Sequence, residues 1–293
     1  MIQKLIAGMG ALMVLMACSP NEVALIDEST IDLNKTFIQQ HEVLADGTYF
    51  MLEAEFDEEG WRRFIEFSVE DSQIATVNFD GVNYFAATFK TAASANELNP
   101  INGDAGQDLR WDQQMEILQR FILEFGALDG LWEPDGFTLD IALYENLFWQ
   151  ALEQGPIESG PYLNGRYFLE EDLSTDADLE SLLEDELDYR YFLNMIVRHG
   201  YIIAVHWNAI NSEGIRKYEP LLTGSILDTE DEIQIWRAQA ALMEAHLIAT
   251  QDPMLMTFDE EELSQEMFGV NIPVQSFIEL AVSALAAGPL LEN

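Results

Sequence analysis

Repetition within the chain is the feature that most constrains its fold. Short blocks of sequence in the first half recur, in the same order, in the second half. Collinear self-similarity of this kind indicates that one structural unit has been duplicated. We therefore expect two homologous modules, residues 41–156 and 157–293. The matched positions are Gly47 and Gly165, Tyr49 and Tyr167, Arg62 and Arg190, Asn83 and Asn211, Trp111 and Trp236, Gln114 and Gln239, Gly136 and Gly269, and Pro156 and Pro289.

The first part of each module has the pattern of strands. In the first module apolar and polar residues alternate over 50–56, 65–70 and 75–79, which is typical of strands with one buried face. The alternation assigns Phe50 and Leu52 to the buried face of the first strand. Because the connections are short, the strands are expected to pair as antiparallel hairpins.

Helical spacing replaces this alternation later in each module. Apolar residues then recur three or four positions apart, which places them on one face of a helix. Strands followed by helices predict an α+β fold, in which each module is a twisted antiparallel strand meander followed by packing helices. The expected apolar faces are Trp111, Met115, Leu118, Ile122 and Phe125, then Tyr144, Leu147, Phe148 and Ala151, and in the second module Trp236, Ala240, Met243 and Leu247, then Phe277, Leu280, Ala281 and Ala284.

The charge balance excludes one class of function. The chain has 53 acidic and 13 basic side chains and a net charge of −40. Such a chain cannot neutralise the phosphates of a nucleic acid, so DNA or RNA binding is excluded as its main role. A hydrophobic share of 48% nevertheless supplies a core, and the acidic surplus is therefore expected on a solvated surface.

The N-terminus has the pattern of an export signal. Lys4 precedes an apolar stretch over 5–16 that is too short for a comfortable membrane-spanning helix. We therefore interpret residues 1–17 as a signal peptide. The stretch ends Leu15-Met16-Ala17-Cys18, which resembles a bacterial lipobox, and Cys18 is the only cysteine of the chain. A single cysteine also excludes an internal disulfide and a thiolate metal cluster.

The lipobox resemblance implies a lipoprotein. Cys18 would receive the lipid and become the mature N-terminus, and residues 18–40 would serve as lipid anchor and tether. Acyl chains anchor a protein stably without a spanning helix. Ser19 after the cysteine favours the outer membrane, so we expect the chain in the bacterial cell envelope, facing the periplasm or the surface. The alternative is an ordinary signal peptide with a chance cysteine.

The strand region resembles a known family. The residues that carry the resemblance are Asp46-Gly47-Thr48-Tyr49, Gly60-Trp61 with Phe64, and Phe79-Asp80-Gly81-Val82-Asn83. They are similar to the FMN-binding domain family, which includes extracytoplasmic flavin lipoproteins and flavin subunits of sodium-pumping and Rnf-type electron-transport complexes. The resemblance implies a bound FMN whose phosphate lies in a closing Ser-Gly-Ala-Thr loop, with the threonine esterified to it in many members.

In this chain the corresponding loop reads Asp135-Gly136-Phe137-Thr138. By the resemblance, Gly136 and Thr138 are the cofactor-binding residues. Backbone N–H groups at a helix N-terminus favour a dianion, and glycine permits its close approach. Asp135 and Asp140 oppose this, because one unit charge about 4 Å from another costs on the order of 4 kcal/mol at an effective dielectric near 20. The alternative makes the Thr138 hydroxyl an N-cap that begins the last helix of the module.

These observations leave two hypotheses of function open. In the first, both modules are degenerate relatives of the FMN-binding family, no cofactor is bound, and the chain is a non-enzymatic binding or assembly component with a protein partner in the envelope. The second module favours this, because it reads Gly269-Val270-Asn271 and lacks the hydroxyl. In the second, the first module carries FMN and the protein transfers electrons. The sequence contains no nucleophile elbow, Walker loop or Rossmann glycine pattern, so a catalytic enzyme lacks support.

Three further features complete the sequence-based hypotheses. The basic pair Arg216-Lys217 follows the third strand of the second module; the family resemblance implies a place near the flavin, and the alternative is a turn with solvated ends. His206 and His246 show no zinc-binding spacing and are expected to be partly buried structural residues. Residues 169–188 form an acidic insertion that could be a partner surface.

Overall fold

The computed structural model describes part of the chain. The described residues are 44–95, 109–128, 131, 135–171, 189–211, 214, 216–217, 232–258, 270, 272 and 274–291, with the backbone alone at 232–235. The predicted signal peptide and tether, the lipidation site Cys18 and most of the acidic insertion lie outside them. Among the described helices, none is both long and apolar enough to cross a membrane.

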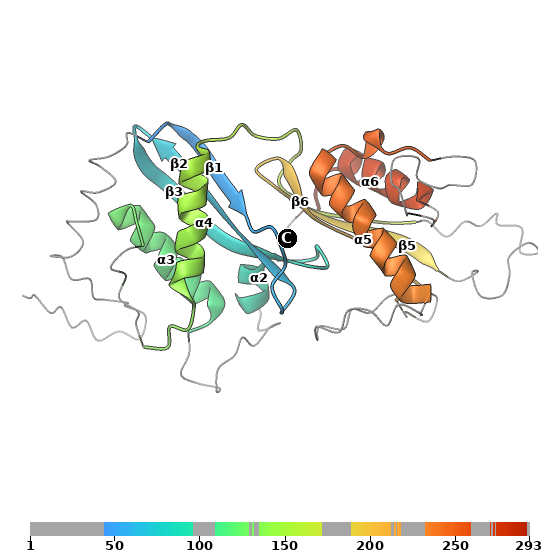
Figure 1. Cartoon of the computed structure of the whole chain (residues 1–293), viewed down its shortest axis with the longest axis horizontal. Coiled ribbons are helices and arrows are strands. Elements are labelled where there is room, and N and C mark those ends of the chain that lie inside the picture. The colour runs from blue at the N-terminus through green and yellow to red at the C-terminus, as the bar shows by residue number, and fades with distance from the viewer. Residues whose placement is uncertain are drawn as a thin grey trace, which may run out of the picture. The chain divides into compact units, whose positions relative to one another are not determined.

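The order of elements agrees with strands followed by helices in each half of the chain (Figure 1). The fold is therefore α+β, as predicted. The first half contains β1 (Gly47–Leu52), β2 (Trp61–Glu70), β3 (Gln73–Asn83), α2 (Lys90–Ala95), α3 (Trp111–Phe125) and α4 (Ile141–Gln154). The second half contains β4 (Gly165–Glu170), β5 (Arg190–Arg198), β6 (Tyr201–Ile210), α5 (Glu232–Thr250), a short 3-10 helix η1 (Pro253–Leu255) and α6 (Gln275–Ala287).

The strands form two antiparallel three-stranded sheets in sequential order, β1-β2-β3 and β4-β5-β6. The turn of the second hairpin has the same backbone conformation in both sheets. Asp71 and Ser72 have φ of 52° and 63°, and His199 and Gly200 have 48° and 77°. Two consecutive residues with positive φ give the twist that a two-residue hairpin needs. In the second sheet Tyr167 lies opposite Met195, and the register shifts at Ile196 and Val197.

The chain divides into two compact units with interleaved residue ranges. Unit 1 comprises Met1–Met51, Ile65–Phe79 and Ser94–Ile157, and unit 2 comprises Leu52–Phe64, Asp80–Ala93 and Glu158–Asn293. Segments 52–64 and 80–93 thus pack with the second half of the chain. These units do not coincide with the two modules, 41–156 and 157–293, that the repeated sequence predicts. The modules therefore remain a prediction from the sequence.

The core of unit 1 confirms the predicted helix faces. The ring of Tyr49 stacks on Phe67 at 4.7 Å, and Phe148 lies 5.3 Å from Phe67. Burial of such apolar side chains stabilises the fold by about 25 cal/mol per Å² removed from water. The buried helix residues are Trp111, Met115, Leu118 and Ile122 from α3 and Tyr144, Leu147, Phe148 and Ala151 from α4, while Phe125 is partly buried.

The first strand is shorter than predicted and buries residues of both faces. It ends at Leu52, and Phe50 of the predicted face is buried, while Leu52 is half-buried. Tyr49 and Met51 of the other face pack in the core of unit 1. The Tyr49 ring stacks in this core while its hydroxyl donates to the carbonyl of Ala45 at 2.9 Å.

The core of unit 2 is built in the same way. The expected faces of its two long helices are buried, and Trp207 of β6 packs against Trp236 and Phe277 at 5.1 and 5.4 Å. The predicted helix faces are confirmed here as well. The buried helix residues are Trp236, Ala240, Met243 and Leu247 from α5 and Phe277, Leu280, Ala281 and Ala284 from α6.

One local geometry recurs at matched positions of the two halves. Gly47 and Gly165 have φ of 140° and 143°. A side-chain carbon added at Gly47 would lie 2.8 Å from Pro156, and one added at Gly165 would lie 2.6 Å from Pro289. Only glycine fits, because both the backbone angle and the approach of the proline exclude a Cβ. The repeated glycines and prolines of the sequence therefore serve one packing contact.

Candidate functional site

The loop of Gly136 and Thr138 lies before α4 in unit 1. Gly136 has φ of 85°, and its carbonyl accepts from Leu109 N at 2.8 Å. The N-cap of α4 is Asp140, whose carboxylate accepts from Ala142 N at 3.1 Å. The interpretation of Thr138 as the N-cap is therefore wrong. A carboxylate two residues later satisfies the free N–H and is also favoured by the helix dipole.

The side chain of Gln114 on α3 bonds the polar groups of this loop. Its Oε1 accepts from Thr138 N at 2.8 Å and from Leu139 N at 3.1 Å. Its Nε2 donates to Leu109 O at 2.6 Å and to Thr138 Oγ1 at 3.2 Å. Gln114 is buried, and a glutamine amide has two donors and one oxygen with two acceptor positions. All four of these hydrogen-bonding positions are used, by Leu109 and by the loop residues Thr138 and Leu139.

The charges around the loop oppose a dianion. Asp135 and Asp140 flank it and are both exposed. The cation nearest in sequence is Arg120, whose guanidinium donates to Glu116 at 2.8 Å. The next is Arg110, whose guanidinium makes two hydrogen bonds to the carboxylate of Asp112 at 3.0 and 2.9 Å. The same bonds hold the pKa of Asp112 below its usual range. The residues of the loop do not fit a bound phosphate, because the N–H groups of Thr138 and Leu139 are bonded to Gln114 and the flanking charges are negative.

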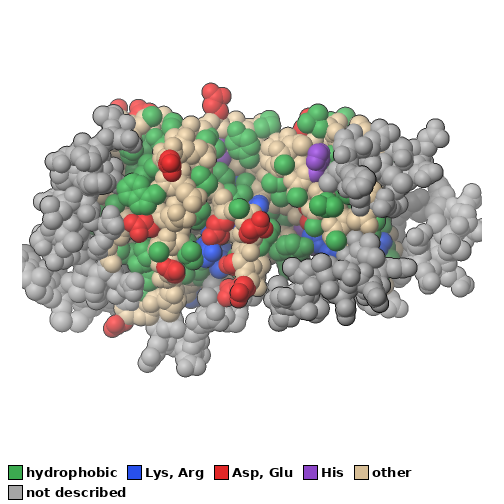
Figure 2. Space-filling view, in the orientation of Figure 1, with side chains coloured by type: hydrophobic (Ala, Val, Ile, Leu, Met, Phe, Trp, Pro, Cys, Tyr) green, Lys and Arg blue, Asp and Glu red, His purple; other side chains and the backbone are tan. Residues whose placement is uncertain are grey.

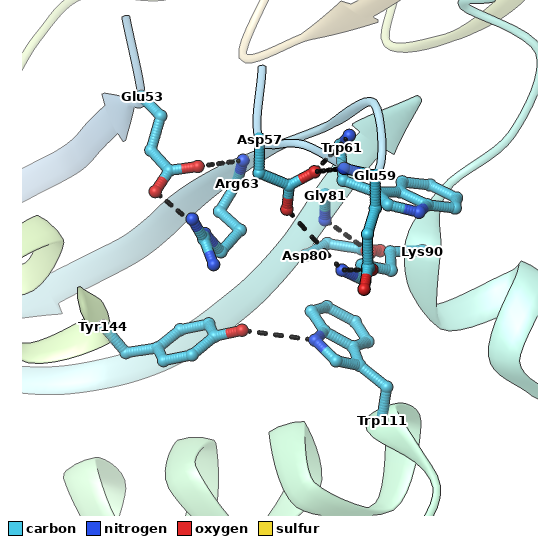
Figure 3. A network of polar contacts seen from close by, with 10 residues as sticks. All are labelled: Glu53, Asp57, Glu59, Trp61, Arg63, Asp80, Gly81, Lys90, Trp111 and Tyr144. Carbon is cyan, nitrogen blue, oxygen red and sulfur yellow. Dashed lines mark hydrogen bonds and ion pairs between the residues drawn. The ribbon is translucent and has the colours of Figure 1, made fainter. Parts of the chain in front are cut away.

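A buried lysine marks the first polar cluster of unit 2 (Figure 3). The Lys90 ammonium lies 5.3 Å from the centre of the Trp61 ring. Two carboxylates lie near it, with Lys90 Nζ 4.0 Å from Asp57 Oδ2 and 3.8 Å from Glu59 Oε2. Burial lowers the pKa of Lys90, and the two acids oppose this shift. Asp57 also accepts from Trp61 N at 2.8 Å and so fixes the loop that begins β2.

A buried aspartate of β3, Asp80, bonds the first turn of the helix that carries this lysine. Asp80 accepts from Gly81 N at 2.7 Å, from Thr91 N at 3.0 Å and from Thr91 Oγ1 at 2.5 Å. Burial raises the pKa of Asp80, and the hydrogen bonds from Thr91 oppose the shift. The carboxylate thus bonds its neighbour in β3 and Thr91 of α2, so its role is to hold β3 against α2.

A buried ion pair marks the second polar cluster of unit 2. Arg237 donates to Glu244 through two parallel hydrogen bonds of 2.7 and 2.6 Å, both within α5. Its Nε donates to the Tyr84 hydroxyl at 2.6 Å. Glu244 also accepts from Trp207 N at 2.7 Å. Bidentate charged bonds of this kind are among the strongest in proteins, and the pKa of Arg237 is raised by Glu244.

His206 lies beside this pair. It is almost completely enclosed, with ring centres of Tyr84 and Phe85 at 5.5 and 5.3 Å. Its Nδ1 is 3.9 Å from Glu244 Oε1, too far for a hydrogen bond. Burial, together with the positive charges of Arg237 and Arg216, lowers the pKa of His206 to about 3. The imidazole is therefore neutral near pH 7, and its burial is deeper than the sequence predicted.

The two residues of the basic pair have different surroundings. Arg216 is exposed, and its guanidinium lies 5.8 Å from the centre of the Phe85 ring. Lys217 is half-buried, and its ammonium lies among aromatic rings and donates to Tyr191 Oη at 3.1 Å. The alternative from the sequence, a turn whose two basic side chains end in solvent, is therefore confirmed for Arg216 and wrong for Lys217. In the part of the chain that the structure describes, no group of three histidine, cysteine or acidic side chains could hold a metal ion.

The comparisons with known proteins identify no family. No family model matches the chain, and no curated protein does. Two solved structures are similar to parts of it. The solution NMR structure of a protein from Clostridium thermocellum is 22% identical, with a TM-score of 0.28, over 38% of this chain and 92% of that chain. The crystal structure of the CPE2226 protein from Clostridium perfringens is 18% identical, with a TM-score of 0.32, over 38% of this chain and 88% of that chain. Both likenesses are low and assign no function.

Proposed function

We propose that this protein is a lipid-anchored, non-enzymatic binding or assembly component of the bacterial envelope. Its loop at Gly136 and Thr138 would descend from an FMN-binding loop and would no longer hold the cofactor. The observation that carries the proposal is the set of hydrogen bonds from Gln114 to this loop. The resemblance stated above supplies the ancestry, and the bonds of Gln114 supply the reason for the loss.

Binding of a phosphate at this loop would replace the neutral amide of Gln114 by a dianion. A phosphate at the loop needs the N–H groups of Thr138 and Leu139, which Gln114 Oε1 now accepts. Moving Gln114 away also leaves the carbonyl of Leu109 without this donor. A buried polar group left without a partner costs roughly 1–3 kcal/mol. Repulsion by Asp135 and Asp140 adds to this cost, so phosphate binding is disfavoured at several points together.

The experiment is a measurement of bound flavin. The full chain, purified from membranes in detergent after co-expression with a flavin transferase, is expected to show no flavin band between roughly 350 and 500 nm, before or after denaturation. Titration with FMN should then give no saturable change. Gln114→Ala frees the loop donors and tests whether Gln114 is the obstacle, with Gln113→Ala on the same helix as control. A stoichiometric flavin band in the unmodified protein would contradict the proposal.

An FMN-carrying electron-transfer lipoprotein is the second candidate. It is favoured by the backbone of Gly136, which has positive φ, and by the exposed position of Thr138. Its signature would be a flavin band that survives denaturation and disappears in Thr138→Ala. A band that is lost on denaturation would indicate non-covalent FMN and would also favour this candidate.

The membrane anchor needs a separate experiment. If Cys18 is acylated, Cys18→Ser should release the protein from the membrane fraction into the soluble fraction. The control is Ser19→Ala, which keeps the cysteine. Unchanged membrane association of Cys18→Ser would refute the anchor and with it the envelope location through lipid.

A further inference from the structure

Lys217 lies in an aromatic cage of unit 2. Its ammonium is 5.8 Å from the centre of the Tyr189 ring, 5.3 Å from that of Tyr191 and 5.1 Å from that of Trp236. A cation within about 6 Å of an aromatic ring is attracted to the face of that ring. Three rings around one nitrogen thus form a site whose chemistry suits an organic cation.

The cage has a firm base. Tyr191 stacks on Trp207 at 5.3 Å, and Trp207 packs against Trp236 at 5.1 Å. Trp207 is fully buried in the core of unit 2. Tyr189 lies directly before β5, two positions before Tyr191. The walls formed by Tyr191 and Trp236 are therefore positioned by contact with the core, independently of the lysine.

The lysine itself is held less firmly than the cage. Its backbone is fixed, because Lys217 N donates to Ala209 O at 2.8 Å. Its ammonium donates to Tyr191 Oη at 3.1 Å. Lysine has four rotatable side-chain bonds and a strongly hydrated ammonium. Rotation of the side chain into water therefore empties the cage without moving the backbone.

The corresponding lysine of the first half has different surroundings. Lys90 follows the bridge of Phe89 to Val82, as Lys217 follows the bridge of Arg216 to Ile210. The ammonium of Lys90 also lies over an aromatic ring, but two carboxylates lie within 4.0 Å of it and its side chain is 6% exposed. The ammonium of Lys90 is therefore balanced by nearby negative charge as well as by the ring, unlike the ring contacts described for Lys217.

We propose that the cage of Tyr189, Tyr191 and Trp236 is a binding site for an alkylammonium group, of which Lys217 is the internal occupant. The ligand class is a quaternary ammonium such as choline. The ring faces accept no ordinary hydrogen bond, and the tyrosine hydroxyl of Tyr191 accepts one N–H of the lysine. A primary ammonium therefore loses water there without full replacement of its three N–H partners, whereas a trimethylammonium has no N–H to satisfy. The net charge of −40 also raises the local concentration of cations around the protein.

The test is calorimetric titration of the full chain, in a maltoside detergent, with choline chloride. Lys217→Gln removes the internal competitor and is expected to bind choline about tenfold more tightly than the unmodified protein, within the range of a desolvated cation–π contact. Adding Tyr189→Leu to Lys217→Gln should reverse this gain. Arg120→Gln removes one exposed positive charge from α3 and serves as control for net charge.

Two further titrations define the ligand. The neutral carbon analogue of choline, with a tert-butyl group in place of trimethylammonium, should bind much more weakly than choline. A short-chain phosphocholine lipid below its micelle concentration stands for a lipid headgroup, and the tighter of choline and this lipid identifies the source of the ligand. The proposal is overturned if Lys217→Gln with a native circular dichroism spectrum shows no saturable binding of either, or binds the neutral analogue equally well. The outcome does not depend on flavin, so it is independent of the proposed function.

Discussion

Replacement of His206 by phenylalanine tests the electrostatics of the buried cluster in unit 2. The imidazole is enclosed by Tyr84 and Phe85, and the positive charges of Arg237 and Arg216 act on it together with burial. All three causes oppose protonation in the folded protein. Phenylalanine has a similar ring and cannot titrate, so His206→Phe removes the linked protonation and keeps most of the packing.

The size of the effect follows from linkage. The pKa of His206 is about 3 in the folded protein, against 6.5 for an ordinary histidine. Above pH 6.5, the pKa of histidine in the unfolded chain, the imidazole is neutral in both the folded and the unfolded protein. His206 then contributes no pH dependence to stability. As the pH falls from about 6.5 toward 3, the unfolded chain binds a proton that the folded chain excludes, so stability is lost. Between about pH 7 and pH 5 the loss is about 2 kcal/mol.

The assay is urea unfolding of the full chain and of His206→Phe at several pH values across this range. The variant should lose about 2 kcal/mol less than the unmodified protein between about pH 7 and pH 5. His246→Phe on α5 is the control for loss of a partly exposed imidazole. Equal losses for His206→Phe and the unmodified protein would refute the claim that the fold keeps His206 neutral.

Three further substitutions test the packing and the polar contacts. Glu244→Leu leaves the Arg237 charge buried without its partner and should lower the free energy of unfolding by about 3–5 kcal/mol. Replacing both residues by leucine should cost less than the sum of the two single changes, and additive costs in urea unfolding would contradict this. Gln114→Ala removes four hydrogen bonds to the 109 and 138–139 backbone and the Thr138 hydroxyl, and should lower stability by about 2–4 kcal/mol; a loss under about 0.5 kcal/mol would show that water replaces the amide. Gly165→Ala places a methyl group 2.6 Å from a proline carbon at φ of 143° and should lower the midpoint of thermal unfolding by several degrees; an unchanged midpoint would refute the packing role of that glycine.

Helix faces were the part of the fold that the sequence predicted best. The expected apolar faces of α3, α4, α5 and α6 are buried almost residue by residue. In α3 the apolar residues form one broad stripe, and a stripe repeated every three or four residues defines one buried face of a helix. In α5 apolar residues also lie on the outer face, as the exposed Leu242 shows. The α+β class follows from the same reasoning, since strand patterns precede helical patterns in both halves.

Strand phase was harder to predict than helix faces. In β1 the residues Tyr49, Phe50, Met51 and Leu52 are all large and apolar, so two opposite faces satisfy the same alternation. Which of them packs in the core of unit 1 depends on a contact with another strand, the stack of Tyr49 on Phe67. Such a partner is distant in sequence and leaves no local signal. Propensity and periodicity therefore locate the strand, and tertiary packing decides its face.

The candidate sites depended even more on distant contacts. Gly136 and Thr138 were found by resemblance, but the residue that bonds them, Gln114, is 24 positions from Thr138 and was visible only as a repeated glutamine. The pairing of Arg237 with Glu244 spans two helical turns and could have been anticipated from charge, since α5 has one other charged residue, Glu232. The contact of Tyr84 with Arg237 could not have been anticipated, because the two residues are 153 positions apart in the sequence.

The two matched lysines show how the halves of a repeated sequence diverge. Lys90 and Lys217 occupy the same place after a short bridge, and each ammonium lies over an aromatic ring that begins the second strand region. Near Lys90 lie two carboxylates, the half-buried Asp57 and the exposed Glu59, whereas near Lys217 lie the rings of Tyr191 and Trp236. Moving the buried Lys90 would separate its charge from both acids. A lysine held by rings can exchange with another cation at little cost, so a cation-dependent function would arise in the second half of the chain and not in the first.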